Sequence, residues 1–175
     1  MSFLFKQYVK NTVNYDLLNK FVYKNVSKLP VLSNVDLQFR FRTYNLQSLI
    51  TSLSALEIIS LNKCLVIKTK SSNISLKLRK GSPIGCKVTL RKTKALTFIV
   101  VLINTLFVEI NTFRLGIGET GLYSERVVPN TLIFPGLAEN YHFFRLLDGL
   151  HIKFITTSET SEELDYLLRS YKLKH

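Results

Sequence analysis

The sequence predicts an α+β fold, with a mostly antiparallel sheet, helices packed on one face and a cationic opposite face. Several segments alternate apolar and polar residues, which is typical of strands with one buried face. Other segments repeat apolar residues at helical spacing. A chain of 175 residues, of which 46% are hydrophobic, can bury a substantial core. No linker or repeat divides it, so we expect residues 1–175 to form a single domain.

The first sixty residues are expected to contain two helices separated by a strand. Residues 16–23 favour a short amphipathic helix, because their apolar residues fall on one side, and Pro30 closes that region. Residues 35–41 alternate large apolar residues with polar or charged ones, which predicts a strand. Apolar residues at helical spacing then predict a second helix over residues 45–60.

The middle of the chain is predicted to hold a strand, a hairpin and a long helix. The strand covers residues 65–68. In residues 74–79 and 86–91, apolar side chains alternate with Ser, Thr, Lys or Arg, so both runs are predicted to be strands. The glycines, serine and proline of residues 81–85 predict the turn between them. An apolar run predicts a buried helix over roughly residues 93–110.

The last third of the chain is predicted to close the sheet and end in a helix. The glycine-containing residues 114–129 are expected to be irregular. Residues 150–154 alternate apolar and polar side chains, which predicts a closing strand. Thr160 and Glu163 have the spacing of a capping box, which predicts a last helix over residues 160–169.

Positive charge is concentrated in the first half of the chain. The formal net charge is +12, yet residues 1–94 hold 17 basic and 3 acidic residues, whereas residues 95–175 hold 7 and 9. Residues 63–94 alone carry ten Lys or Arg and no Asp or Glu. A local cationic surface of this kind favours a nucleic-acid partner, with an anionic lipid surface as the alternative.

The sequence gives no support for a catalytic, nucleotide or metal site. Gly116, Gly118 and Gly121 match the spacing of the dinucleotide fingerprint, but a long helix is predicted before them and no helix after them. The three histidines are scattered, and no nucleophile has a base supplied by a motif. We therefore expect no enzyme activity, no cofactor and no metal. Cys64 and Cys86 form no CxxC motif, which indicates two free thiols in a reducing compartment.

Membrane insertion is not expected either. The longest apolar run, residues 95–110, is shorter than the roughly 20 residues that a spanning helix needs, and polar residues interrupt it. Ala, Gly and Pro are scarce, with 3, 7 and 4 residues, which is the bias of an AT-rich coding genome such as that of an organelle. The first ten residues resemble neither a secretory signal nor a targeting helix, and an organelle-encoded protein would need neither.

The predicted polar face suits structured RNA better than stacked bases. Phe39 and Phe41 could stack on RNA bases, but they share a face with Val35 and Leu37, which makes them core residues. The polar face of the predicted hairpin offers Lys, Arg and Thr without an aromatic residue. Such a face favours contacts with phosphate and ribose. A free RNA-binding regulator that uses a sheet face remains the alternative.

The run from Arg79 to Arg91, RKGSPIGCKVTLR, closely resembles the signature of a known family. This is the universal large-subunit ribosomal protein L-five family, which binds 5S rRNA. Further landmarks follow in the same order as in the family: Phe21, Tyr23, Pro30, Ile133-Phe134-Pro135, Gly149, Thr156-Thr157, Thr160 and Glu162-Glu163. The resemblance covers about residues 15–173 and leaves residues 1–14 as an N-terminal extension.

The resemblance implies a structural protein of the central protuberance of the large ribosomal subunit. Its partners would be large-subunit rRNA, 5S rRNA, the P-site tRNA and neighbouring ribosomal proteins. Gln38 replaces the family's first-strand Asn, Asn62 replaces a Gln before the second strand, and Arg40 and Arg42 lie in or near the places of glycines. These changes alter reach and charge. The RNA is therefore expected to be 5S rRNA or a substitute for it.

Two sets of residues are expected to carry this function. The rRNA contacts are cationic or hydroxyl-bearing residues of the polar face and its approaches, namely Arg40, Arg42, Lys63, Lys77, Arg79, Lys87, Thr89 and Arg91. The loop expected to approach the tRNA comprises Lys70, Ser71, Ser72 and Asn73, which would otherwise be an ordinary polar hairpin tip. The composition and the family together predict a mitochondrial ribosome and an organelle-encoded chain.

Overall fold

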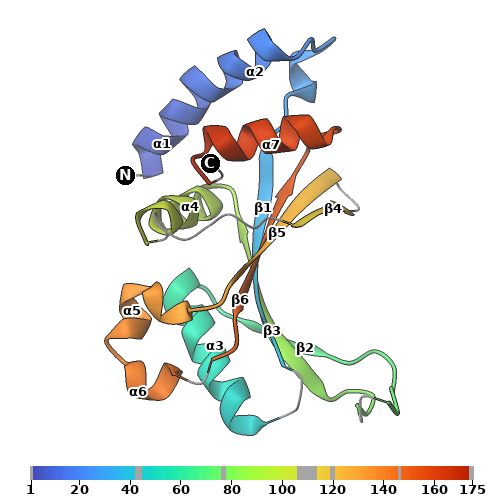
Figure 1. Ribbon diagram of the computed structural model, residues 1–175, viewed down its shortest axis with the longest axis vertical. Helices are drawn as coiled ribbons and strands as arrows, with labels where there is room; N and C mark the ends of the chain where they lie inside the picture. The colour runs from blue at the N-terminus through green and yellow to red at the C-terminus, as the bar shows by residue number, and fades with distance from the viewer. Residues whose placement is uncertain are drawn as a thin grey trace. The chain divides into compact units, whose positions relative to one another are not determined.

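The described strands form one six-stranded sheet in the order β2-β3-β1-β6-β5-β4 (Figure 1). The computed structural model describes residues 2–41, 45–75, 78–105, 114–118, 121–145 and 147–173. The strands are β1 Leu32–Arg40, β2 Leu65–Lys68, β3 Pro83–Arg91, β4 Arg114–Gly118, β5 Gly121–Val128 and β6 Leu150–Thr156. The longer helices are α1 Ser2–Tyr8, α2 Asn14–Lys20, α3 Leu46–Ser60, α4 Thr93–Thr105 and α7 Ser161–Ser170. One sheet with helices between its strands confirms the predicted α+β class.

Short helical turns complete the described chain. A π-helical turn, η1 Val9–Val13, joins α1 to α2, and η2 Val26–Lys28 is a 3-10 turn before β1. Between β5 and β6 lie η3 Thr131–Ile133, α5 Pro135–Ala138 and α6 Tyr141–Phe144.

The chain divides into two compact units. The first comprises Met1–Val35, Leu90–Arg126 and Lys153–His175, and the second comprises Asp36–Thr89 and Val127–Ile152. Each unit is thus assembled from segments that are distant in the sequence. The expectation of a single domain over residues 1–175 stays a prediction.

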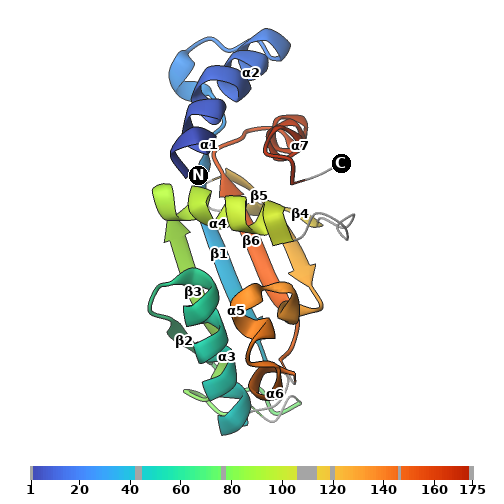
Figure 2. The same cartoon turned by 90° about the vertical axis from the view of Figure 1, so that its left-hand side faces the viewer.

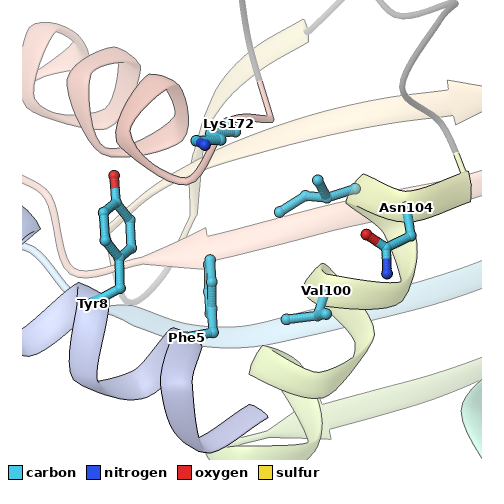
Figure 3. Close-up of a pocket in the computed structure, with 6 residues that line it drawn as sticks. Phe5, Tyr8, Val100, Asn104 and Lys172 are labelled. Atoms are coloured by element: carbon cyan, nitrogen blue, oxygen red, sulfur yellow. The ribbon is translucent and has the colours of Figure 1, made fainter. Parts of the chain in front are cut away.

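In the first unit, the N-terminal residues are helical from Ser2 to Lys20 and pack on two later helices. α1 contacts α4, and α2 contacts α7. Phe5 and Tyr8 project from α1 toward a cavity of about 250 Å³ that Val100, Asn104 and Lys172 also line (Figure 3). Among the described side chains of residues 3–20, only Val13 and Leu17 are buried, so this arm rests on the unit through few residues.

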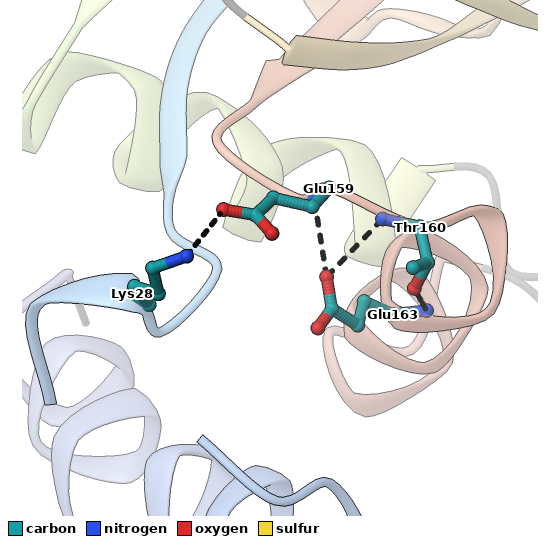
Figure 4. A network of polar contacts seen from close by, with 4 residues as sticks. All are labelled: Lys28, Glu159, Thr160 and Glu163. Carbon is teal, nitrogen blue, oxygen red and sulfur yellow. Dashed lines mark hydrogen bonds and ion pairs between the residues drawn. The ribbon is translucent and has the colours of Figure 1, made fainter. Parts of the chain in front are cut away.

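The start of α7 confirms the predicted capping box. The Thr160 Oγ1 accepts a hydrogen bond from the Glu163 amide at 3.3 Å, and Glu163 Oε2 accepts one from the Thr160 amide at 3.3 Å. The same carboxylate accepts a bond from the Glu159 amide at 3.0 Å (Figure 4). The Lys28 ammonium lies 3.3 Å from the Glu159 carboxylate, which ties the chain before β1 to this helix start.

In the second unit, helices cover one face of the strands. α3, α5 and α6 lie on the same side of them (Figure 2). α3 buries Ala55 and Leu56, while β1 and β3 bury Leu37, Phe39 and Val88 from the sheet. This arrangement confirms helices on one face of the sheet, as the alternating pattern predicts.

Two predicted helices differ from the structure at their ends. The short helix expected at residues 16–23 is α2, which ends at Lys20, and helical structure already begins at Ser2. α4 is described to Thr105, and residues 106–110 of the predicted helix lie outside the described residues.

The predicted hairpin of residues 74–79 and 86–91 is wrong. β3 pairs antiparallel with β2, with Leu65 opposite Lys87 and Val66 opposite Cys86. Asn73 and Leu78 form only an isolated bridge. Pro83 is tolerated because it is the first residue of its strand. The supposed turn residues 83–85 are therefore part of β3.

The irregular segment expected at residues 114–129 is also wrong. β4 and β5 form an antiparallel pair, with Gly116 opposite Tyr123. Two of the three buried positions of β5 carry Ser124 and Arg126. Because these buried positions carry polar residues, β5 lacks the alternation of apolar and polar side chains by which a strand is recognised. Likewise, β1 begins at Leu32 and ends at Arg40, so Phe41 lies beyond the strand.

Candidate nucleic-acid interface

The open face of β1 and β3 carries polar and charged side chains. In β3, Lys87 and Thr89 alternate with the buried Cys86 and Val88. In β1, residues 36, 38 and 40 alternate with buried apolar residues in the same way. Because neighbouring residues of a strand point to opposite faces, these polar side chains lie on the face away from the core.

Gly85 allows the two strands to approach each other closely. A Cβ atom at this position would lie 2.3 Å from the Phe39 carbonyl oxygen. Nearby, the Phe41 amide donates a hydrogen bond to the Ile84 carbonyl at 2.9 Å. Gly85 is itself buried, and no side chain fits at this position between the strands.

Arg40 is positioned by its neighbour on the same face. Its Nε and Nη2 atoms each donate to the Gln38 Oε1 atom at 3.4 Å. Arg40 is exposed, and the amide of Gln38 is half-buried. The guanidinium is therefore held at the end of β1, on the polar side of the strand, where a phosphate can reach it.

Lys87 forms an ion pair with a buried carboxylate. Its Nζ lies 2.7 Å from Asp36 Oδ2, and the side chains are 36% and 6% exposed. The other carboxylate oxygen, Oδ1, is buried and has no hydrogen-bond partner among the described residues. Lys87 is thus a compensated cation, and its predicted role as a phosphate contact stays a prediction.

Polar bonds close the base of the loop between β2 and β3. The Thr69 hydroxyl donates to the Arg79 carbonyl at 2.6 Å, and the Ser82 hydroxyl donates to the same carbonyl at 2.7 Å. The Thr69 amide donates to the Ser82 carbonyl at 2.9 Å. Gly81 has a φ of +85°, a left-handed conformation that glycine adopts without strain.

The tip of this loop extends beyond the ends of the two strands (Figure 1). Asn73 and Leu78 exchange two backbone hydrogen bonds of 2.9 Å, and the Ser75 hydroxyl donates to Asn73 Oδ1 at 2.6 Å. The four residues predicted to approach tRNA, namely Lys70, Ser71, Ser72 and Asn73, are all exposed on it. The structure therefore places them together on a projecting loop with an ordered base.

The other predicted rRNA contacts have different environments. Arg40, Lys63, Arg79 and Arg91 are exposed, and Thr89 is half-buried. Arg42 and Lys77 lie outside the described residues. Sequence reasoning missed Lys68 and Lys80, two exposed cations of the same run of ten. It also missed the pairing of Asp36, although Asp36 alternates with core residues and so belongs to the polar face.

The described residues show no alternative chemical centre. No three His, Cys, Asp or Glu side chains in the described ranges are grouped so as to hold a metal ion. No helix within them is long and apolar enough to cross a membrane. Cys86 is buried, and its sulfur lies 3.3 Å from the Ser52 hydroxyl. Burial raises the pKa of the Cys64 thiol to about 12, and Glu57 adds to this effect.

Comparisons with known proteins find relatives among the ribosomal proteins. Residues 83–175 match a model of the C-terminus of the ribosomal L5 family. The large ribosomal subunit protein uL5 of Nitrosomonas europaea is 33% identical over 172 residues, which cover 95% of this chain and 94% of that protein. That of Clostridium tetani is 36% identical over 160 residues, which cover 87% of each chain.

A further relative carries a different name. The large ribosomal subunit protein uL5m of Reclinomonas americana is 28% identical over 174 residues, which cover 96% of this chain and 95% of that protein. The family model covers more than half of this chain, and the bacterial relatives exceed 30% identity over most of its length. The chain therefore belongs to the uL5 family of ribosomal proteins.

Proposed function

We propose that the chain is a structural constituent of a large ribosomal subunit and holds rRNA on the open face of β1 and β3. Membership in a family of ribosomal proteins supports this role and confirms the prediction that the chain is not an enzyme. The observation that carries the proposal is three exposed arginines: Arg40 ends β1, Arg91 ends β3, and Arg79 lies in the loop before β3. Such cations neutralise phosphates and release counterions.

Contacts with the RNA backbone follow from the chemistry of these residues. Guanidinium groups bind phosphate in a bidentate manner, so Arg40, Arg79 and Arg91 would hold phosphates, with Lys63 as a further point charge. The hydroxyl of Thr89 can donate to a phosphate or accept from a ribose 2′-hydroxyl. We propose that the RNA is 5S rRNA, or a substitute for it, in the central protuberance.

The loop between β2 and β3 would reach the tRNA in the P site. Its support is the exposed tip at residues 70–73 and the ordered base at Thr69 and Ser82. A projecting loop with a fixed base can hold a contact outside the body of the protein.

A free RNA-binding regulator is the less favoured function. That role needs exposed aromatic residues on which single-stranded bases stack. Phe39 is fully buried, so it cannot stack on a base. The described open face of β1 and β3 carries no aromatic residue.

The ribosome is proposed to be mitochondrial. The similarity to a uL5m protein and the scarcity of Ala, Gly and Pro support this location. The bacterial relatives are more similar, at 33% and 36% identity against 28%, which fits an organelle of bacterial ancestry.

Co-sedimentation and salt dependence test the function. We expect the protein to migrate with large subunits at low salt and to bind their rRNA with an affinity that falls as salt rises. Replacing Arg79 and Arg91 with Gln should flatten the log–log salt dependence by about 0.7–0.9 for each lost phosphate contact. An unchanged slope would exclude these two contacts, and absence from large subunits would exclude the ribosomal role.

A further inference from the structure

A second cationic surface lies in the first unit, formed by residues other than the predicted rRNA contacts. It is a groove of about 500 Å³ between the N-terminal helical arm, the start of β1 and the start of α4. Every residue that lines it belongs to the first unit. Its volume is that of pockets that accept small ligands or the side chains of a partner.

The walls of the groove are mainly apolar. Val9 of the arm, Leu32 of β1 and Leu96 of α4 line it, together with Tyr171. Leu32 and Tyr171 are buried at its base, whereas Val31 at its rim is 50% exposed. A recess of this kind exposes apolar surface to water unless a partner covers it.

Lysines surround this apolar recess. Lys6, Lys10 and Lys92 line the groove, and none of its lining residues is Asp or Glu. Lys6 and Lys10 are four residues apart in continuous helix, so they lie on one side of the arm. Lys92 has a φ of +51°, a left-handed conformation that is strained for a residue with a side chain. The groove thus combines an apolar interior with lysines that meet no carboxylate among its lining residues.

This combination fits an acidic protein segment better than RNA. An apolar side chain of such a segment can fill the recess while flanking carboxylates pair with the lysines. RNA would match the charge, but it would leave the apolar interior unfilled. Tyr171 is only 1% exposed, so the aromatic ring at the base offers no surface for base stacking.

The N-terminal helical arm is attached to the rest of the first unit through the side that carries Phe5. Its other side lines the groove. Phe5 makes an edge contact with Tyr171 at 5.7 Å and lines the smaller cavity against α4 (Figure 3). Phe3 and Leu4, both 68% exposed, extend the apolar surface of the arm. A partner segment could therefore cover more than the groove itself.

We propose that this groove binds an acidic amphipathic segment of a neighbouring protein in the assembly. Leucine- or phenylalanine-like side chains enter the recess, and carboxylates meet Lys6, Lys10 and Lys92. Arg40, Lys63, Arg79 and Lys87 belong to the second unit. Arg91, by contrast, belongs to the first unit and directly precedes Lys92 of the groove. None of the residues that line the groove is itself a predicted rRNA contact, so the proposal does not depend on which RNA those contacts hold.

A peptide titration with the purified full-length protein tests the groove. The probe is a fluorescent helical peptide that repeats Glu and Leu at amphipathic spacing, with a peptide that carries Lys in place of Glu as its control. We expect the acidic peptide to bind, and the Lys6→Glu/Lys10→Glu variant to weaken binding by about tenfold or more. The matched variant Lys24→Glu, an exposed lysine outside the groove, should change binding by less than about twofold.

Two outcomes of this titration would overturn the proposal. One is absence of binding to the unmodified protein. The other is an oligouridylate RNA that loses affinity in the Lys6→Glu/Lys10→Glu variant while the acidic peptide does not. A thermal midpoint within about 2 °C of the unmodified protein shows that the variants fold.

Cross-linking in intact large subunits provides the second test. A carbodiimide joins amines directly to carboxylates, so Lys6, Lys10 or Lys92 should be joined to Asp or Glu of another protein. Ultraviolet cross-links from these lysines to rRNA would instead make the groove an RNA site. Equal acetylation of the three lysines in the particle and in the free protein would show that nothing covers the groove. If replacing Arg79 and Arg91 with Gln left the salt dependence of rRNA binding unchanged, only the proposed rRNA contacts would be rejected. The proposed groove would not be affected by that result.

Discussion

At the scale of single residues, the pairing of Asp36 with Lys87 changes how the open face is understood. A carboxylate that is 4% exposed is costly to desolvate, and the ammonium 2.7 Å away offsets that cost. The same contact reduces the charge that Lys87 offers to phosphate. Within β3, the exposed Arg91 therefore carries more of the expected RNA affinity than the half-buried Lys87.

Replacing Lys87 should lower the stability of the protein, whereas replacing Asp36 should raise its affinity for RNA. Lys87→Met leaves a buried carboxylate without compensation, so we expect a loss of stability on the order of 3 kcal/mol in urea unfolding. Asp36→Asn removes the charge that holds Lys87, and RNA affinity should rise with a salt dependence steeper by about 0.7–0.9. The double variant should recover most of the lost stability.

The matched control for this pair is Arg79→Met, an exposed cation without a buried carboxylate. It should weaken RNA binding and change stability by less than about 0.5 kcal/mol. Equal destabilisation by Lys87→Met and by Arg79→Met would show that the ion pair does not contribute to stability.

The two thiols should react slowly in the folded protein, and the pH dependence of the reaction should show the cause. Burial raises the pKa of Cys64 to about 12 and also raises the pKa of Cys86, so both remain protonated where a free thiol ionises. Alkylation by iodoacetamide requires the thiolate. At about pH 8 we expect the thiolate fraction of Cys64, and with it the rate of alkylation, to be about a thousandfold lower than in the unfolded chain, with a rate that rises with pH.

Mass spectrometry of the folded and the urea-unfolded protein measures this difference. Cys64 is half-buried, so solvent can reach it in part and the raised pKa must account for slow reaction. Rapid modification of Cys64 in the folded protein at neutral pH would contradict the raised pKa.

At the scale of elements, Gly85 and Gly81 are needed for different reasons, which makes their variants a useful comparison. A Cβ on Gly85 would lie 2.3 Å from the Phe39 carbonyl oxygen, so Gly85→Ala must push β3 away from β1. We expect a loss of about 3 kcal/mol and weaker RNA binding. A Cβ on Gly81 would meet no atom within 4 Å, but the φ of this residue is +85°. Gly81→Ala should therefore cost about 1–2 kcal/mol through backbone strain alone.

Urea unfolding of both variants distinguishes steric clash from backbone strain. Equal losses would show that the steric clash at Gly85 costs no more than the backbone strain at Gly81. The loss at Gly81 should leave the proposed rRNA contact Arg40 on β1 in place, because that glycine lies in the loop between β2 and β3.

Local signals predicted elements well, and non-local pairing was the source of error. The capping box of Thr160 and Glu163 was predictable because both partners lie within four residues. The strand partner of β3 is set by contacts between distant residues, so the sequence did not separate β2 from residues 74–79. β5 was missed because Ser124 and Arg126 occupy buried positions that usually hold apolar residues.

The candidate site was predictable to the same degree. The alternation in β1 and β3 and the run of ten cations identify the polar face and its loop. The ion pair of Asp36 with Lys87 was not predictable, because the two residues are 51 positions apart and meet only through the strand order.

At the scale of the whole molecule, the sheet order makes β3 and β6 depend on a strand from the first forty residues. β1 lies between β3 and β6, although it is the first strand in the sequence. The family match begins at residue 83 and so leaves β1 outside it. A match in sequence therefore does not define a part that can fold alone.

A fragment of residues 83–175 should consequently fail to fold. It lacks β1, so β3 and β6 lose the strand that each of them pairs with, and the buried Leu37 and Phe39 are lost from the core. We expect no cooperative thermal transition by circular dichroism, because the loss exceeds the stability of about 5–15 kcal/mol that a domain possesses. A chain that lacks residues 1–8 is the control, because none of the described side chains of α1 is buried in the full protein. That chain should still unfold cooperatively, with a midpoint lower by a few degrees. A cooperative transition in residues 83–175 would show that β1 is dispensable, whereas complementation by residues 1–82 would confirm that it completes the sheet.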